Sequence, residues 1–143
     1  MYRYSLVLIK PDAIRRKLCG EIISTYEKAG LDLCSIKIIQ MDRDIAEGFY
    51  HVHKGKEFFQ RLINFMVSAP TIAMVLGGND AIKKIREING LTDPKEATET
   101  TIRGKWALDV TRNSVHASDS PESAESEIAY FFPAFEILKY EGA

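Results

Sequence analysis

The segment YSLVLI at residues 4–9 constrains the fold of this chain more than any other. It is a short, continuous apolar run, and Lys10, Pro11 and Asp12 follow it directly. A strand with one face in water alternates apolar and polar residues, whereas an uninterrupted apolar run is typical of a strand covered on both faces. We therefore predict a strand at 4–9, ended by Pro11 and Asp12 and packed against other elements on both sides.

Three further segments have the pattern of strands. Residues 31–41 are rich in β-branched side chains and alternate in part, and TIAMVL at 71–76 is a second apolar run. In WALDV at 106–110, large apolar residues alternate with an alanine and an aspartate, which predicts a strand with one covered face.

Helices are predicted from periodicity and from their end signals. Asp44 and Glu47 fit a capping box at the start of a short helix that runs to about His51. A stripe of Phe58, Phe59, Leu62, Ile63 and Met66 predicts the next helix, which Pro70 ends. The remaining predicted helices are 20–29 with Gly30 after its end, a helix from Asn79 or Asp80 to Gly90, and one from Ser120-Pro121 to about Phe132. Residues 91–105 are expected to form a long polar loop.

The order of these elements predicts one domain over residues 1–143. No internal repeat, low-complexity tract or linker-like segment divides the sequence. Alternating strands and helices indicate an α/β or α+β sandwich, in which helices pack on a single sheet. Periodicity by itself leaves two topologies open, a parallel doubly wound sheet and an antiparallel, ferredoxin-like one.

The composition argues against several classes of protein. The 143 residues are 45% apolar and 27% charged, and a formal net charge of −1 disfavours a general nucleic-acid binder held by phosphate charge. No run approaches the ~18 apolar residues of a membrane span. The apolar run near the N-terminus is shorter than that of a signal peptide, and no small-residue cleavage site follows it, so we expect no signal peptide. Cys19 and Cys34 stand alone, as is usual in a reducing compartment. We expect a cytoplasmic protein with no membrane partner and no dedicated nucleic-acid partner.

Familiar phosphate-binding and metal-binding motifs are missing from the sequence. It contains no GxxxxGK[ST] loop, no GxGxxG and no HExxH. His51 and His53 have a spacing that can bind a metal, but no cysteine or carboxylate cluster accompanies them. Any nucleotide phosphate would therefore have to be held by side chains.

NSVHASDS at 113–120 places His116 among small polar residues, a composition that is typical of a loop. Glu127 follows on the last predicted helix, where Ala124, Ile128 and Phe131 put it along the apolar stripe. A carboxylate that faces a core needs a partner. It is either a residue at the rim of the core or a partner of the His116 imidazole.

Five other residues are ambiguous when taken singly. Lys10, Arg86 and Arg103 each have the character of an ordinary solvated charge. Phe58 and Phe59 are adjacent, so both rings cannot face the same side of a helix. One ring should lie at a rim, where it is free to stack on a ligand.

These residues together resemble the nucleoside diphosphate kinase family. The family signature N-x-x-H-[GA]-S-D stands here as Asn113-Ser114-Val115-His116-Ala117-Ser118-Asp119. The resemblance covers nearly the whole chain, through LIKPDAIRR, GKEFFQRLINFMVSAP, NGLTDP, TIRG and SDSPESAESEIAYFF. It implies a ferredoxin-like α/β sandwich with a four-stranded antiparallel sheet covered by helices.

The resemblance also implies an activity, a mechanism and a set of site residues. The γ-phosphate of a nucleoside triphosphate, typically ATP, would pass to a nucleoside diphosphate through a phosphohistidine on His116, with ping-pong kinetics. Ser118 and Glu127 resemble the pair that supports this histidine, and Mg²⁺ would bind through the nucleotide phosphates, with no direct protein ligand. The residues that resemble the nucleotide-binding groups are Lys10, Tyr50, Phe58, Leu62, Arg86, Thr92, Arg103 and Asn113.

The sequence departs from the family pattern at two places, and two competing functions remain. Ala117 replaces the commoner Gly after the histidine, a variation that the signature allows. Glu99-Thr100 replaces a Pro-Gly before TIRG, so the loop before Arg103 is expected to differ in shape or mobility. The chain ends at EILKYEGA, shorter than the longer members, which leaves a homo-oligomer of two, four or six subunits open. The competing functions are a catalytically silent, ferredoxin-like binding regulator of nucleotides or nucleic acid, and a phosphohistidine carrier. The complete set from Lys10 to Glu127 argues against both.

Overall fold

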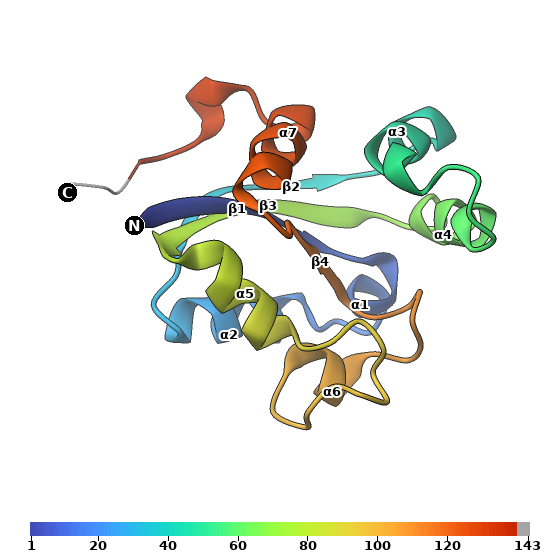
Figure 1. Ribbon diagram of the computed structural model, residues 1–143, viewed down its shortest axis with the longest axis horizontal. Coiled ribbons are helices and arrows are strands. Elements are labelled where there is room, and N and C mark those ends of the chain that lie inside the picture. Colours follow the sequence, from blue (N-terminus) through green and yellow to red (C-terminus); the bar gives the residue numbers. More distant parts are fainter. Residues whose placement is uncertain (140–143) are drawn as a thin grey trace.

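The computed structural model describes residues 1–139, and its strands form one four-stranded sheet (Figure 1). The strands are β1 (Tyr2–Ile9), β2 (Asp32–Ile39), β3 (Thr71–Asn79) and β4 (Val115–Ala117). Their order is β2-β3-β1-β4, and every neighbouring pair is antiparallel. This is the split βαβ arrangement of the ferredoxin-like fold, so the antiparallel alternative is confirmed.

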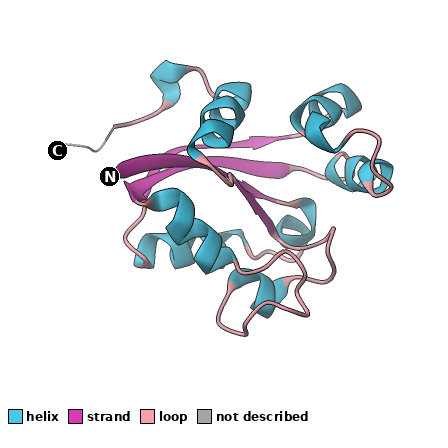
Figure 2. Cartoon of the chain, viewed as in Figure 1, coloured by secondary structure: helices cyan, strands magenta, loops and turns pink. Residues whose placement is uncertain are grey.

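Helices cover both faces of the sheet (Figures 1 and 2). In the view of Figure 1, α3 and α7 lie above the sheet, α4 lies beyond its right-hand end, and α1, α2, α5 and α6 lie below it. The helices are α1 (Pro11–Arg15), α2 (Cys19–Lys28), α3 (Arg43–Phe49), α4 (Phe59–Met66), α5 (Ala81–Asn89), α6 (Ile102–Trp106) and α7 (Pro121–Phe131), with short 3-10 helices at His51–His53 and Ala134–Glu136.

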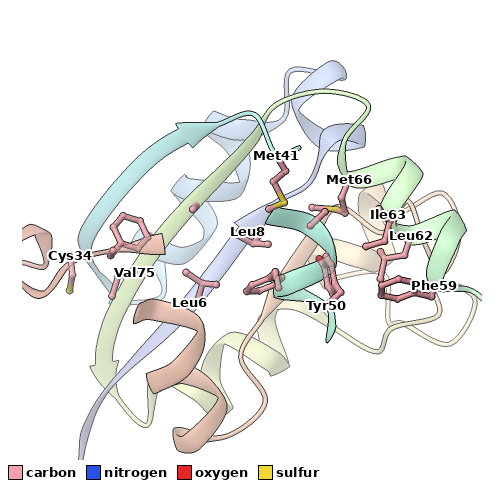
Figure 3. Close-up of a cluster of buried hydrophobic side chains, with 14 residues drawn as sticks. Leu6, Leu8, Cys34, Met41, Tyr50, Phe59, Leu62, Ile63, Met66 and Val75 are labelled. Atoms are coloured by element: carbon pink, nitrogen blue, oxygen red, sulfur yellow. The ribbon is translucent and has the colours of Figure 1, made fainter. Parts of the chain in front are cut away.

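The apolar run in β1 explains the two layers. Leu6 and Leu8 belong to one core cluster and Val7 and Ile9 to the other, and all four side chains are fully buried. Figure 3 shows Leu6 and Leu8 of β1 in the same cluster as Met41 and as Ile63 and Met66 of α4. The prediction of a strand covered on both faces is therefore confirmed.

The strand predicted at 106–110 is wrong. Trp106 is the last residue of α6, which falls inside what was predicted as polar loop and strand, and residues 107–114 form no regular element. Instead, the fourth strand is β4, where His116 pairs with Leu8 of β1. The alternation in WALDV was misleading because Leu108 and Val110 are about half exposed and face no core.

Two further details of the helices differ from expectation. Asp42, not Asp44, caps α3, because its carboxylate accepts a hydrogen bond from the Ile45 amide at 2.8 Å. α1 is an unpredicted short helix that Pro11 begins, at the end of β1. The start of α7 is confirmed: the Ser120 hydroxyl accepts from the Ser123 amide at 3.0 Å and Pro121 follows.

The structure leaves part of the C-terminal sequence EILKYEGA undescribed, since residues 140–143 lie outside the described residues. Within residues 1–139, no helix is both long and apolar enough to cross a membrane.

Candidate active site

A cleft of about 790 Å³ opens above β4, in the size range of ligand sites. Its floor includes His116, and its walls come from residues 48–62 and from residues 86–113. The predicted site residues that line it are Lys10, Tyr50, Phe58, Leu62, Arg86, Thr92, Arg103, Asn113, His116 and Glu127. Ser118 lies directly behind, fully buried. The fold thus brings together residues that are spread over most of the chain.

The floor of the cleft holds a chain of hydrogen bonds that ends at the histidine. Ser118 is bound to β1, since its Oγ accepts from the Leu6 amide at 3.1 Å. The same Oγ donates to Glu127 Oε1 at 2.9 Å, and this oxygen lies 3.0 Å from His116 Nε2. The sequence left Glu127 either at the rim of the core or paired with the His116 imidazole. In the structure it is the partner of the imidazole.

Helix α7 and strand β4 position this pair. His116 is held by the backbone pairing of β4 with β1, and its ring meets the edge of the Phe49 ring, with centroids 5.2 Å apart. The capped start of α7 fixes the helix, whose buried face is marked by Ala124 and carries Glu127 inward. The side chains of His116 and Glu127 each keep 22% exposure, so the ring is supported from behind and open to the cleft.

Lys10 and Asn113 form a buried polar pair beside the floor. Lys10 Nζ donates to Asn113 Oδ1 at 2.9 Å and to the Thr111 carbonyl at 3.4 Å. Burial, aided by the nearby positive charge of Arg103, lowers the pKa of Lys10 to about 8. Asn113 Nδ2 donates to the carbonyls of Thr92 and Val110, both at 3.2 Å. A buried ammonium with so few acceptors is prepared to bind an anionic or hydroxyl oxygen of a ligand.

Arg86 and Arg103 supply two more positive charges. Arg86 is exposed, and its Nη1 reaches the Ala117 carbonyl at 3.5 Å. Arg103 is buried on α6 and donates to the carbonyls of Gly90 and Val115, both at 2.8 Å. Burial also lowers the pKa of Arg103. Because Arg103 ties α5 to β4, it has a structural role whatever it binds, and the residues Glu99-Thr100 lie in the exposed loop that precedes it.

The aromatic wall contains Tyr50, His53 and Phe58. Phe59 is buried and Phe58 is half-buried at the lip, as expected for two adjacent rings. The rings of His53 and Phe58 lie 5.2 Å apart, and Tyr50 Oη is buried with no hydrogen-bond partner among the described residues. Burial, together with the charge of Glu127, raises the pKa of Tyr50. Leu62 completes the wall as a buried apolar residue.

Sequence reasoning missed several residues of the cleft. Phe49 was not singled out, although it packs on His116. Val110 falls in the strand predicted at 106–110, and Thr111 falls in no predicted element, although both line the cleft. Arg61 also lines the cleft, but in the sequence it stands among the apolar residues of α4. The position of Phe49 three residues after the buried Ala46 is the one signal that pointed inward; Arg61 and Thr111 gave none.

Comparison with known proteins agrees with the fold. The sequence model of the nucleoside diphosphate kinase family matches residues 3–137. The chain is 49% identical to a nucleoside diphosphate kinase of Carboxydothermus hydrogenoformans over 137 residues, 96% of this chain and 92% of the relative. It is 50% identical to that of Saccharolobus solfataricus over 128 residues, 90% and 93% of the two chains.

Solved structures of the same family superpose closely. The crystal structure of the Aquifex aeolicus nucleoside diphosphate kinase gives a TM-score of 0.94 at 40% identity, over 96% of this chain and 100% of the other. The Halobacterium salinarum enzyme in complex with CDP also gives 0.94, at 35% identity, over 98% and 93%. With this cleft, this fold and these relatives, the chain belongs to the nucleoside diphosphate kinase family and is an enzyme of that class.

Proposed function

We propose that His116 carries the phosphoryl group between two nucleotides, in a ping-pong reaction. The observation that carries this proposal is the hydrogen bond between His116 Nε2 and Glu127 Oε1. A carboxylate oxygen accepts hydrogen bonds, so Nε2 holds the ring proton and Nδ1 keeps its lone pair. Nδ1 is then the nucleophile, an assignment that the sequence left open.

The two half-reactions use the same site in turn. Nδ1 attacks the γ-phosphorus of the triphosphate, the bond from that phosphorus to the β–γ bridging oxygen breaks, and the diphosphate leaves with the electron pair. A terminal oxygen of the second diphosphate then attacks the phosphorus, and the P–N bond breaks to restore Nδ1. Glu127 stabilises the positive charge that the ring gains when phosphorylated, and Ser118 orients Glu127.

Side chains take the place of a glycine-rich phosphate loop in this proposal. Arg86, Arg103 and Thr92 would hold the phosphates of ATP and of other nucleoside triphosphates and diphosphates. Lys10 and Asn113 would contact the sugar and phosphate oxygens, and Tyr50 lies near the reacting ring. Phe58 and Leu62 would hold the base by stacking and apolar contact, which is nearly indifferent to base identity.

Mg²⁺ is proposed to enter with the nucleotide. No group of three or more His, Cys, Asp and Glu side chains that could hold a metal ion occurs in residues 1–139. Phosphate oxygens of the nucleotide would hold the ion, and Asp119 is an exposed carboxylate in the lining of the cleft. When bound, the ion would neutralise charge on the phosphates.

Labelling with γ-³²P-ATP tests the proposal. Incubation with Mg²⁺ and no acceptor should leave an acid-labile, alkali-stable label on the protein, and any nucleoside diphosphate should discharge it. Phosphorus NMR of the labelled protein should report phosphorus on Nδ1. His116→Ala should remove the label without unfolding the chain. An acid-stable label, or one that survives in this variant, would refute the assignment of the nucleophile.

We also propose that the chain assembles into a homo-oligomer through β2. This strand is at the edge of the sheet, and Ile36 and Ile38 on it are 45% and 71% exposed. An exposed apolar edge strand favours pairing with another copy. Dimer, tetramer and hexamer remain the expected states. Light scattering should report a mass well above the 16.1 kDa of one chain, and Ile38→Lys should lower it.

The remaining proposals concern domain organisation and location. We propose a single domain over residues 1–143, which the family match over residues 3–137 supports. We propose a cytoplasmic location, supported by the free thiols of Cys19 and Cys34. Cell fractionation followed by immunoblotting would test this location.

A further inference from the structure

The two walls of the cleft are joined by one hydrogen bond. The first wall is the helical arm, residues 43–66, which carries Phe58 and Leu62. The second is the segment 107–114, which carries Val110. Arg61 Nε of the arm donates to Thr111 Oγ1 at 3.1 Å. Among residues 1–139, no other hydrogen bond connects the arm to this segment.

The position of the segment 107–114 depends on hydrogen bonds that involve side chains. It has no helix or strand, and Asp109 Oδ1 accepts from the amides of Thr111 and Arg112, so the turn is closed on itself. Its hydrogen bonds to the rest of the cleft run through Asn113, which is bonded to Lys10 and Thr92, and through Thr111. The Thr111 carbonyl accepts from Lys10, and the Thr111 hydroxyl accepts from Arg61 of the arm. Thr111 is 9% exposed, so a broken bond would leave its hydroxyl poorly hydrated.

Arg61 is placed to act on the cleft, not on the core. Its backbone lies beside the buried Leu62, but its own side chain is exposed and lines the cleft. Among the described residues, the Arg61 side chain forms no ion pair with a carboxylate, and its one hydrogen bond is the bond to Thr111. Arg43 differs in this respect, because it is bonded within the arm, to Asn64 and Gln60, and lies outside the cleft.

We propose that the Arg61–Thr111 bond is a clamp that fixes the separation of the Phe58 and Val110 walls and so positions the nucleotide base. Arg61 is a positioning residue in this proposal, which rests on the proposed function of the cleft. The clamp acts on the base, while the phosphoryl group is transferred at the floor. Loss of the clamp should therefore raise the KM for nucleotides and leave the reactivity of His116 unchanged.

The experiment uses five variants and two phosphoryl donors. Arg61→Met and Thr111→Val each remove one half of the clamp, and their double variant closes a double-mutant cycle. Arg43→Met is the matched control, since it removes a guanidinium from the same arm outside the cleft. ATP is the nucleotide donor, and phosphoramidate is the donor that has neither base nor sugar.

Each clamp variant is expected to raise the KM for ATP about 3- to 20-fold, the range for one lost hydrogen bond, with little change in kcat. The double variant should be no worse than the worse single one, and the rate at which phosphoramidate labels His116 should stay at the wild-type value in all. Thr111→Ser keeps the hydroxyl and should restore most of the affinity lost in Thr111→Val.

Three results would overturn the clamp. These are additive effects in the double variant, an equal rise of KM in Arg43→Met, and a slower phosphoramidate reaction in Arg61→Met. The last would place Arg61 in the transfer step. A wild-type protein that neither donor labels would instead refute the proposed function itself, so the two failures are distinguishable.

Discussion

The floor of the cleft and its two walls are built in different ways. The floor rests on backbone pairing, since β4 is bonded to β1 and Ser118 is fully buried behind Glu127. The walls are an arm of short helices and an irregular segment, which meet through the bond from Arg61 to Thr111. In the proposed function, the chemistry thus lies on paired strands, and the recognition of the base lies on short helices and an irregular segment.

This difference has a physical reason. A nucleophile must be aligned with a phosphorus atom within a narrow range of distance and angle, and a sheet holds that geometry well. A base that varies in size is better served by walls whose side chains can adapt. Changes in the floor should therefore lower kcat, and changes in the walls should raise KM.

The largest expected effect comes from the floor. Glu127→Ala removes the acceptor of His116 Nε2–H and should lower kcat about 10- to 100-fold, the effect of losing a partly buried hydrogen bond to a charged group. Its KM for nucleotides should change by no more than about twofold. Steady-state kinetics with ATP and a nucleoside diphosphate measures both. Glu125→Ala, an exposed carboxylate on the same helix, is the control, and an unchanged kcat in Glu127→Ala would break the comparison.

The next effect belongs to the aromatic wall. Phe58→Ala should raise KM about 10- to 50-fold and to a similar degree for A, G, C and U nucleotides, because stacking contributes roughly 1–3 kcal/mol per base. Phe135, which is 86% exposed outside the cleft, provides the control substitution Phe135→Ala. Wild-type discrimination of ~10⁴-fold among bases would require hydrogen bonds to their edges and would contradict recognition by stacking.

Lys10 lies beside the floor and is bonded to Thr111 and Asn113 of the wall segment 107–114. Its contribution to nucleotide affinity should depend on pH. Burial and Arg103 lower its pKa to about 8, so it is mainly cationic below this pH and mainly neutral above it. If the cation binds the nucleotide, the affinity for ADP should fall by up to about tenfold from pH 7 to pH 9 as this charge is lost. Calorimetric titration across that range measures the affinity. Lys10→Met should lack this pH dependence, and its persistence there would assign the titration to another group.

The contribution of Lys10 to the stability of the fold should rise with pH, whereas its contribution to nucleotide affinity should fall. Between about pH 8 and its ordinary pKa of 10.5, native Lys10 has lost a proton that the unfolded chain retains. The unfolded state then binds more protons, so this residue's contribution to the free energy of unfolding rises with pH over that range. Urea unfolding of the wild type and of Lys10→Met at several pH values would isolate this contribution.

The smallest effect concerns strain at the entrance to β4. Ser114 is fully buried with φ +74°, a left-handed conformation that favours glycine, and its Oγ has no partner among the described residues. Ser114→Gly should stabilise the fold by about 0.5–1 kcal/mol in urea unfolding. Ser126→Gly, in an exposed position of α7, should destabilise it by a similar amount. A loss of stability in Ser114→Gly would show that the floor holds no such strain.

The sequence by itself determined the elements with a strong period or a strong end signal. The run at 4–9 predicted a strand covered on both faces, and Leu6 and Val7 do enter different core clusters. The apolar stripe on α4 and the Ser120-Pro121 start of α7 were also found, because periodic burial and capping are local in the chain. The family signature at 113–119 predicted Asn113, His116 and Ser118 as site residues, and the fold brings these three residues to the cleft or directly behind it.

The tertiary structure decided what has no local signal. β4 is three residues long, too short for any period, and it is a strand because Leu8 of β1 offers His116 a pairing partner. WALDV alternates yet has no strand beside it. The contact between Arg61 and Thr111 joins residues 50 positions apart. From the sequence, Glu127 could lie at the rim of the core or pair with His116, and only the packing of α7 on the sheet decides for His116. Pairing across a sheet and closure of a cleft are made by the whole fold, so only the folded chain could place His116 on the floor of the cleft and join its walls.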